Sequence, residues 1–437
     1  MTKTIGIILT VLLTSMFFFP VGIIFLHIPN SKNLLAAIGL ALALLYLVRQ
    51  EDVSVPRELL VLLLFSGMVS LLSLVSITYN QTPDNTYVSF IRSTAIWLSS
   101  AFTVACAIHG VHGRIDAPLV AHYLIGACMF QCVTAMLIAF VPSFSAFVDQ
   151  YFDTGQALLK KLDRLYGIGA SLDVAGSRFS AVLVAIAFLA ASSPQKVSSR
   201  LAVFYTLSFI LISIIGNMIA RTTTVGMLIG LAWLLVAPFI LSRESRREGR
   251  SKKILAILAT TMTLVFVSVV LYNTNPEVQD FFRFGFEGFF NYFETGEWET
   301  DSTAKLETMV VWPEELRTWL IGDGYFMNSR YDPNYLGDAT DQGFYMGTDV
   351  GYLRFLFYFG IAGLVWIVAF IVYSAIVCCK YFKEYTWLFL LALLVGLVVW
   401  AKVSTDIFLF FAIFLCAAAL QDKQDDCTEN TEKTETT

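Results

Sequence analysis

The sequence predicts an all-α polytopic integral membrane protein with about twelve transmembrane helices, and three features support this fold class. Hydrophobic residues make up 57% of the 437 positions and charged residues only 14%, whereas about a quarter of the residues of a soluble domain are charged. Apolar runs of about 20 residues, the length that crosses a bilayer as a helix, recur along the whole chain. The segment 242–253 holds six basic residues in twelve positions, which is typical of a cytoplasmic loop.

The expected spans follow the apolar runs along the chain. The first run is too long for a signal peptide and no small-residue cleavage site follows it, so we interpret it as a membrane span. Short polar interruptions separate the later spans, including a turn near Arg221 and another near Lys402. The expected spans are 5–27, 33–49, 58–79, 88–109, 118–141, 178–192, 201–219, 222–241, 254–272, 349–379, 386–401 and 403–420.

The placement of basic residues predicts the topology. With segment 242–253 in the cytoplasm and twelve spans, both termini are cytoplasmic and the two longest loops face outward. The polar tail has no apolar face to bury and is expected to be disordered. The predicted organisation is spans one to five in 1–141, an outer loop in 142–177, spans six to nine in 178–272, a large outer loop in 273–348, spans ten to twelve in 349–420 and a disordered cytoplasmic tail in 421–437.

The two outer loops differ in composition. In loop 142–177 the apolar residues fall at roughly helical spacing among charged ones, which predicts a helix lying in the membrane interface. Loop 273–348 carries fourteen acidic, four basic and seventeen aromatic residues. Its stretch 281–293, FFRFGFEGFFNYF, is expected to dock at the lipid surface or to roof a cavity. Aromatic faces beside carboxylates, as at Trp312, suit sugar rings, although they equally suit a small core or an interfacial belt.

Five cations map to the outer ends of the predicted spans, against the usual bias for basic residues inside. Each could extend to lipid headgroups or pair with a local acid. As a group they instead favour a site for an anion at the membrane surface, because an unpaired cation among helices is costly. Arginine suits a diphosphate in particular, since its planar guanidinium makes paired, permanently charged contacts. These cations are Arg92, Arg178, Arg221, Arg354 and Lys402.

Motifs for nucleotide or metal chemistry are not found in the sequence. The four histidines, His27, His109, His112 and His122, lie in or beside the predicted spans, and the large outer loop has none. The pair at 109 and 112 has no nearby third ligand. We therefore expect a protein that needs neither a metal nor another cofactor.

Three stretches resemble one family of membrane enzymes. RTTTVGMLIGLAWLL (221–235), WPEELRTWLIGDGYF (312–326) and TDVGYLRFLFYFGIAGL (348–364) are similar in kind and order to motifs of the bacterial O-antigen and capsule polysaccharide polymerases, the Wzy family. The resemblance covers roughly residues 170–420. That family is related to the O-antigen ligases, which rely on a histidine in the large outer loop, so the absence of histidine there favours a polymerase.

The resemblance implies a GT-C-like membrane glycosyltransferase in the bacterial inner membrane, with the large loop in the periplasm. Such an enzyme joins undecaprenyl-diphosphate-linked oligosaccharide units into O-antigen, capsule or another polysaccharide, as in lipopolysaccharide biosynthesis. Its expected partners are the lipid-linked glycan, membrane lipids and a chain-length regulator, with no nucleic acid. Periplasmic arginines are the usual functional residues of the family, and Arg178 and Arg221 match them best by position.

The candidate site combines the charge pattern with the resemblance. Arg178, Arg221 and Arg354 are expected to neutralise the departing diphosphate, and Asp349 to orient or deprotonate the acceptor hydroxyl. Asp349 could instead cap the helix after it, together with Thr348, or pair with Arg354. The catalytic candidates are Asp349, Arg178 and Arg221, and the substrate-binding candidates are Arg354, Arg92, Lys305, Arg317, Tyr352 and Trp312.

Two other classes of function stay open at this point. A ligase, or a transporter or flippase of lipid-linked glycans, would also use outer arginines. A structural subunit of a membrane complex would not require them. The long acidic and aromatic loop on one face, and the lack of an internal repeat, argue against a transporter.

Overall fold

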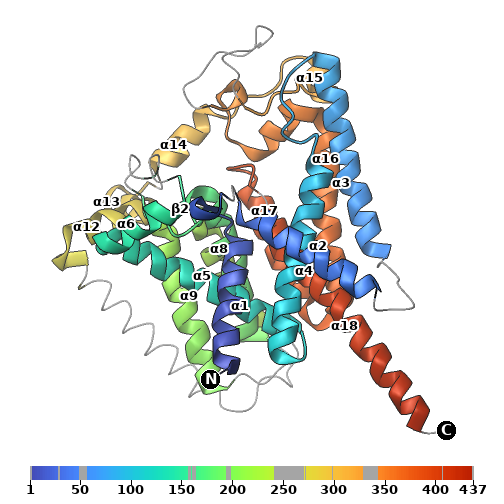
Figure 1. Ribbon diagram of the computed structural model, residues 1–437. Coiled ribbons are helices and arrows are strands. Elements are labelled where there is room, and N and C mark those ends of the chain that lie inside the picture. Colours follow the sequence, from blue (N-terminus) through green and yellow to red (C-terminus); the bar gives the residue numbers. More distant parts are fainter. Residues whose placement is uncertain are drawn as a thin grey trace.

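The computed structural model of the protein describes residues 2–27, 30–48, 57–155, 159, 164–192, 198–240, 270, 272–297, 299–327, 343–405 and 407–435 (Figure 1). Most of this described part is helical, with one short two-stranded sheet. Both chain ends lie at the lower end of Figure 1, and helices α14 and α15 lie at the opposite end. We call that opposite end the loop end of the molecule.

The first five helices lie at the positions of the first five predicted spans. Local signals set several of their ends: Asp116 accepts a hydrogen bond from the Leu119 backbone N–H at 2.9 Å and caps α5, while Gly113, with a φ of 69°, ends α4. These helices are α1 (Thr2–Phe18), α2 (Ser31–Val48), α3 (Arg57–Asn80), α4 (Phe90–His112) and α5 (Ala117–Phe140).

The predicted first span, 5–27, is wrong at its end. Helix α1 stops at Phe18, because Pro20 supplies no backbone N–H and disfavours a helical residue before it. The chain then forms strand β1 (Gly22–Ile23), which pairs antiparallel with β2 (Phe152–Asp153), and a short 3₁₀ helix, η1 (Ile24–Leu26). The end of α1 is thereby tied to the first predicted outer loop.

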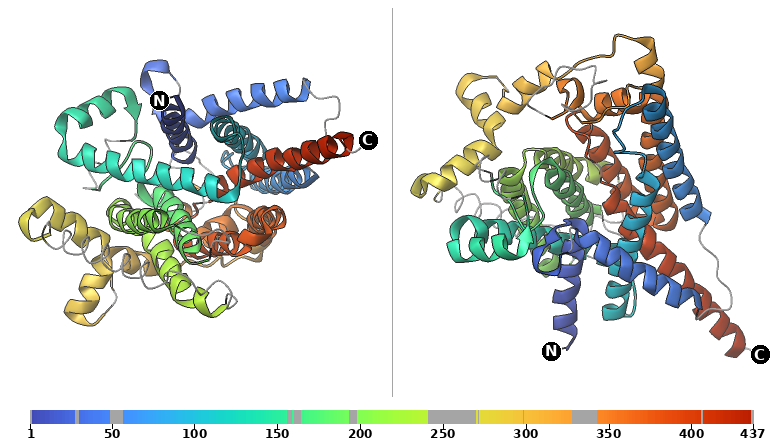
Figure 2. Two further views of the ribbon diagram at one scale, coloured as in Figure 1. Left: turned by 90° about the horizontal axis from the view of Figure 1, so that it is seen from below. Right: turned by 45° about the horizontal axis from the view of Figure 1, so that its top comes forward.

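The middle of the chain places α8 at the centre of the molecule. Helix α8 packs against α5, α9, α10 and α17, and the view from below in Figure 2 shows α8–α10 beside the helices of the C-terminal part. It begins six residues before the predicted span, so Arg178 lies well inside the helix. The elements here are α6 (Pro142–Tyr151), α8 (Leu172–Ser192), α9 (Ser199–Ile219) and α10 (Thr223–Ile240).

The large predicted loop 273–348 contains short helices rather than irregular chain. Helix α12 packs against α9, and α15 packs against α3 and α16. These elements are α12 (Pro276–Gly285), α13 (Glu287–Thr295), α14 (Asp301–Thr308), α15 (Leu316–Ile321) and the 3₁₀ helix η3 (Tyr345–Gly347).

The C-terminal part comprises α16 (Gly351–Tyr381), η4 (Lys383–Tyr385), α17 (Thr386–Val399) and α18 (Phe408–Glu435). The predicted division of the last apolar stretch near Lys402 is present as the turn between α17 and α18. Helix α18 stays helical to Glu435, where the sequence predicted a disordered tail. Extending an existing helix costs far less than nucleating one, and no proline or glycine interrupts residues 421–435.

Helix α16 is interrupted, which the sequence analysis did not foresee. At Phe359 and Gly360 the backbone leaves the helical region, with φ values of −137° and 67°. Residues 322–327, which we call the strap, lie against this break. The backbone N–H groups of Asp323 and Gly324 donate to the carbonyls of Phe357 and Tyr358 at 2.6 and 3.1 Å.

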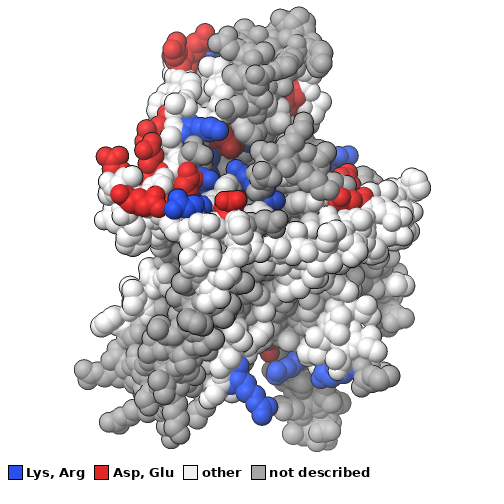
Figure 3. Space-filling model, turned by 90° about the vertical axis from the view of Figure 1, so that its left-hand side faces the viewer, with Lys and Arg blue, Asp and Glu red and all other residues white. Residues whose placement is uncertain are grey.

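The described helices are compatible with an all-α integral membrane protein. Six of them are long and apolar enough to cross a membrane, and four shorter apolar helices accompany them. On the face drawn in Figure 3, the described charged side chains gather in the upper part and at the lower edge, and the described residues between them are uncharged. The predicted basic loop 242–253 and almost all of the predicted span 254–272 fall outside the described residues.

The break in α16 predicts a strong requirement for glycine at position 360. Its φ of +67° with a ψ of −171° is a conformation essentially restricted to glycine, and an added Cβ would lie 2.4 Å from the Leu320 carbonyl oxygen. Gly360→Ala should lower the free energy of unfolding by about 1–3 kcal/mol, measured on the purified protein in detergent.

Gly110→Ala is the matched control, because it sits within helix α4 and, apart from the adjacent backbone of that helix, no described atom lies within 4 Å of its added Cβ. It should leave stability unchanged or slightly raised. Equal stability of the two variants would show that the break does not depend on glycine.

Candidate functional site

A cavity of about 670 Å³ opens where the loop end meets the long helices. Its described lining comes from the starts of α8 and α16, the α9–α10 and α17–α18 turns, and α12 and α14. Six basic side chains and two carboxylates line it, and apolar side chains and two hydroxyl groups complete the lining. The charged members are Arg164, Arg178, Arg221, Lys305, Arg354, Lys402, Asp173 and Asp349, and the others are Leu172, Val174, Phe284, Leu306, Met309, Phe344, Val403, Ser404 and Thr405.

Arg354 is the most enclosed of the cations that line the cavity, with 6% of its side chain exposed. Its guanidinium carbon lies 3.8 Å from the ring centre of Phe326 and 4.2 Å from that of Phe344, so two aromatic rings hold it. It donates to the hydroxyl of Ser404 at 2.8 Å and approaches the Asp349 carboxylate to 3.4 Å. Its buried Nε atom has no hydrogen-bond partner among the described residues.

Asp349 lies between several charges. Burial raises the pKa of its carboxyl to about 6, although Arg354 and Lys402 favour the anion, and Asp173 adds to the rise. Desolvation therefore outweighs the nearby cations. A carboxyl with this pKa can take up a proton near neutral pH, which is what general-base chemistry needs.

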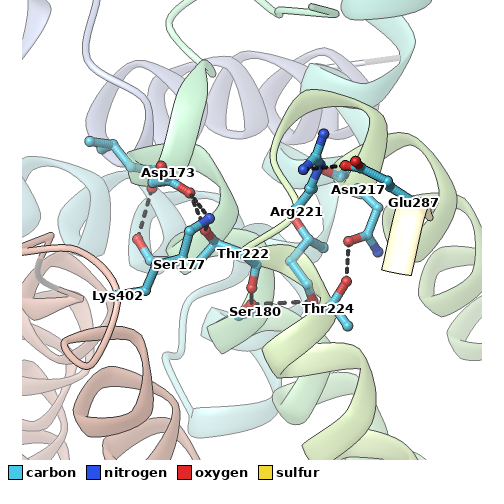
Figure 4. Close-up of polar contacts among 12 residues, drawn as sticks. Asp173, Ser177, Ser180, Asn217, Arg221, Thr222, Thr224, Glu287 and Lys402 are labelled. Atoms are coloured by element: carbon cyan, nitrogen blue, oxygen red, sulfur yellow. Dashed lines mark hydrogen bonds and ion pairs between the residues drawn. The ribbon is translucent and has the colours of Figure 1, made fainter. Parts of the chain in front are cut away.

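Asp173 forms a second acidic centre that is held differently (Figure 4). Its carboxylate accepts hydrogen bonds from the hydroxyl of Thr222 and from Lys402 Nζ, the latter at 3.1 Å. Lys402 also donates to Thr222 Oγ1 at 3.3 Å. Ser180 donates to the Thr222 carbonyl at 2.9 Å and so fixes the turn that carries this threonine. The group joins α8, the α9–α10 turn and the α17–α18 turn.

Arg221 connects the α9–α10 turn to the loop helices. Its Nε donates to the Phe284 carbonyl at 2.9 Å, its guanidinium lies 4.3 Å from the Phe284 ring centre, and it forms an ion pair with Glu287 (Figure 4). Arg178 is anchored from α8 by donating to the Phe18 carbonyl at 2.6 Å. Both arginines thus face the cavity from fixed positions.

The structure brings together four of the five cations that the sequence grouped, namely Arg178, Arg221, Arg354 and Lys402, and Lys305 joins them. Arg92 is exposed on α4 and does not line the cavity. Charge alone could not distinguish it, because its outer position resembles that of the others.

Besides Arg92, three further predicted substrate-binding residues do not line the cavity. Arg317 contacts Asn80 at 2.8 Å and Asp323 at 3.2 Å, and thus holds α15 against α3. The hydroxyl of Tyr352 donates to the Leu397 carbonyl at 2.7 Å. Trp312 is 60% exposed and stacks on Trp319, with ring centres 6.0 Å apart. Each therefore has a partner elsewhere in the described structure.

The suggested role of Asp349 as a helix cap is wrong, because α16 begins at Gly351 and no side chain caps it. The suggested pairing with Arg354 is present. Sequence reasoning missed Asp173 and Arg164 as site residues. The sequence signal for Asp173 was its position just before predicted span 178–192, five residues before Arg178. Arg164 lies 4.9 Å from the Phe284 ring centre and was assigned only to the outer loop.

No group of three histidine, cysteine or acidic side chains suited to a metal ion occurs among the described residues. No protein-family model and no curated protein matches the chain.

Arg221 is expected to hold α12 and α13 in place. Arg221→Ala should speed amide hydrogen exchange over residues 276–295, because it removes the contacts to Phe284 and Glu287. Arg221→Lys should have an intermediate effect, since lysine keeps the charge but lacks the planar fork. Mass spectrometry of the exchanged protein measures both. Arg92→Ala is the control, and unchanged exchange in Arg221→Ala would show that α12 is held by α9 alone.

Proposed function

We propose that the protein is a membrane glycosyltransferase that polymerises lipid-diphosphate-linked oligosaccharide units, with the cavity as its active site. The observation that carries the proposal is that six basic side chains line one cavity together with Asp349, a carboxyl with a raised pKa, at the ends of apolar helices. The sequence resemblance to the Wzy polymerases supports the same reaction. Under this proposal the chain crosses the bacterial inner membrane twelve times, with both termini cytoplasmic and the cavity periplasmic.

The cations match the charge that the reaction creates. In the proposed reaction an acceptor hydroxyl oxygen bonds to the anomeric carbon of the donor chain, and the bond from that carbon to the diphosphate oxygen breaks. Both bonding electrons leave with the lipid diphosphate. Arg178, Arg221 and Arg354 stabilise this growing negative charge from fixed positions, which lowers the barrier. The acceptor proton passes to the Asp349 carboxylate, which balances the step.

The two carboxylates have different roles in this proposal. Asp173 pairs with Lys402 and accepts a hydrogen bond from the Thr222 hydroxyl, so it keeps Lys402 directed into the cavity and takes no proton. The pKa of the Asp349 carboxyl, about 6, is close to neutral pH, so this group exchanges protons with the acceptor. Environments that separate two acidic groups in this way are typical of assigned acid and base roles. Leu172, Val174 and Val403 give the cavity an apolar wall beside the first lipid carbons of a substrate.

Among related reactions, polymerisation is favoured over transfer to a lipid A core. The O-antigen ligases rely on a histidine in the large loop, and residues 273–348 contain none. A flippase of lipid-linked glycans would use the cations without the carboxyl of Asp349. The dependence on this residue therefore separates catalysis from transport.

The direct test is polymerisation of a lipid-linked repeat unit by the purified protein in vesicles, with products resolved on a gel. Arg178→Ala, Arg221→Ala, Arg354→Ala and Asp349→Ala should each lower the rate by about 100-fold or more, the effect of removing one preorganised charge-stabilising group. Arg92→Ala is the matched control and should retain the wild-type ladder. Wild-type rates in all four variants, with normal expression, would refute the assigned site. Flipping without polymerisation would identify a transporter.

The pKa of Asp349 gives the rate a defined pH dependence. Because the base acts as the carboxylate, kcat/KM should rise with pH and level off above about 6, falling about tenfold per unit below that value. Asp349→Asn should remove this limb along with most of the activity. An acid limb retained unchanged in Asp349→Asn would assign the titration to another group.

A further inference from the structure

Arg354 is held by a segment far from it in the sequence. One face of its guanidinium lies on the Phe326 ring at 3.8 Å, and its Nη2 donates to the Phe326 carbonyl at 3.3 Å. Phe326 belongs to the strap, residues 322–327, so the direction in which Arg354 points depends on the position of the strap.

The end of α3 and the turn that follows it form hydrogen bonds with every second residue of the strap. Asn80 donates to the Gly322 carbonyl at 2.9 Å, and Thr82 donates to the Gly324 carbonyl at 2.8 Å. The third contact is made by a carboxylate: Asp84 Oδ2 accepts from the backbone N–H groups of Phe326 and Met327 at 2.8 and 3.1 Å.

Asp84 is itself fixed on its other side. Its Oδ1 accepts from the backbone N–H of Thr86 at 3.0 Å and from the Thr86 hydroxyl. Its backbone carbonyl accepts from the Tyr358 hydroxyl at 2.8 Å, and Tyr358 belongs to α16. Both carboxylate oxygens are therefore acceptors, and the residue touches the two segments that carry Arg354 and Phe326.

We infer that Asp84 is a positioning residue for the cavity: its carboxylate fixes residues 326 and 327, which in turn direct Arg354 toward a bound diphosphate group. The identity of that anion rests on the proposed function, whereas the link from Asp84 to Arg354 does not. Asp84 does not line the cavity and takes no part in proton transfer.

Asp84→Asn is a discriminating substitution because it preserves shape and changes only the acceptors. An asparagine has a single acceptor oxygen, so its amide group must face either the Thr86 N–H or the strap N–H groups, donor against donor. Loss of positioning should weaken the binding of an anion to the cavity. Simple electrostatics predicts the opposite, because removing a negative charge near a cationic cavity should tighten that binding.

The experiment measures the binding of inorganic pyrophosphate to the purified full-length protein in nanodiscs by calorimetry. Asp84→Asn should weaken binding by at least about five-fold, within the coupling expected inside one hydrogen-bond network. Glu314→Gln, which removes an exposed acid of the same region, should stay near the wild type. In Arg354→Ala, adding Asp84→Asn should cause no further loss. Tighter binding in Asp84→Asn, or fully additive losses in the double variant, would overturn the inference.

A second readout tests the positioning without any ligand. Phenylglyoxal modifies accessible guanidinium groups, and the extent at Arg354 is measured by mass spectrometry. Arg354 should be protected in the wild type and in Glu314→Gln, and modified several-fold faster in Asp84→Asn. Equal protection in all three proteins would refute the role of Asp84. If the wild type fails to bind pyrophosphate while this labelling difference is present, the proposed function fails and the positioning role stands.

Discussion

The hydrogen bonding at the break in α16 is the constraint on which the rest of the loop end depends. A helix interrupted among apolar neighbours exposes backbone carbonyls that cost several kcal/mol each when they find no partner. Here the strap supplies two N–H groups, and the Ser76 hydroxyl donates to the Tyr358 carbonyl at 2.7 Å. The strap reaches this position only because Gly322 and Gly324 adopt positive φ values of 81° and 76°. The part of α16 before the break, which carries Arg354, is thereby held in place.

The cavity takes its character from two carboxylates that the fold treats differently. Asp173 contacts Lys402 and Thr222, and so it helps to hold together α8, the α9–α10 turn and the α17–α18 turn. Asp349 has one cation at 3.4 Å, and burial raises the pKa of its carboxyl, so its charge is less secure. The basic residues around them come from six separate segments. No single part of the chain can form such a site, so its geometry depends on how these segments pack together.

Periodicity and charge predicted most of the long helices, because a bilayer-length apolar run has few other uses. They also grouped four cations that the fold does bring together. These two signals failed where the structure depends on backbone hydrogen bonds between residues far apart in the sequence. The sequence around Gly360 is as apolar as the rest of its helix, so nothing local marks the break. Asp173 and Arg164 became site residues only through partners on other elements, and Arg92 was left outside by the direction in which α4 presents it.

The contacts between the α3–α4 turn and the strap join positions 242 residues apart in the chain. During synthesis on the ribosome, Asn80, Thr82 and Asp84 are therefore made long before the residues they bind. The interrupted α16 is equally incomplete until the strap that precedes it has met that turn. Pairings at such sequence separation form late, because the loop that they close is long. We therefore expect the enclosure of Arg354 to be among the final steps of assembly, and a chain cut short before residue 322 to lack the part of the cavity that Phe344, Asp349 and Arg354 line.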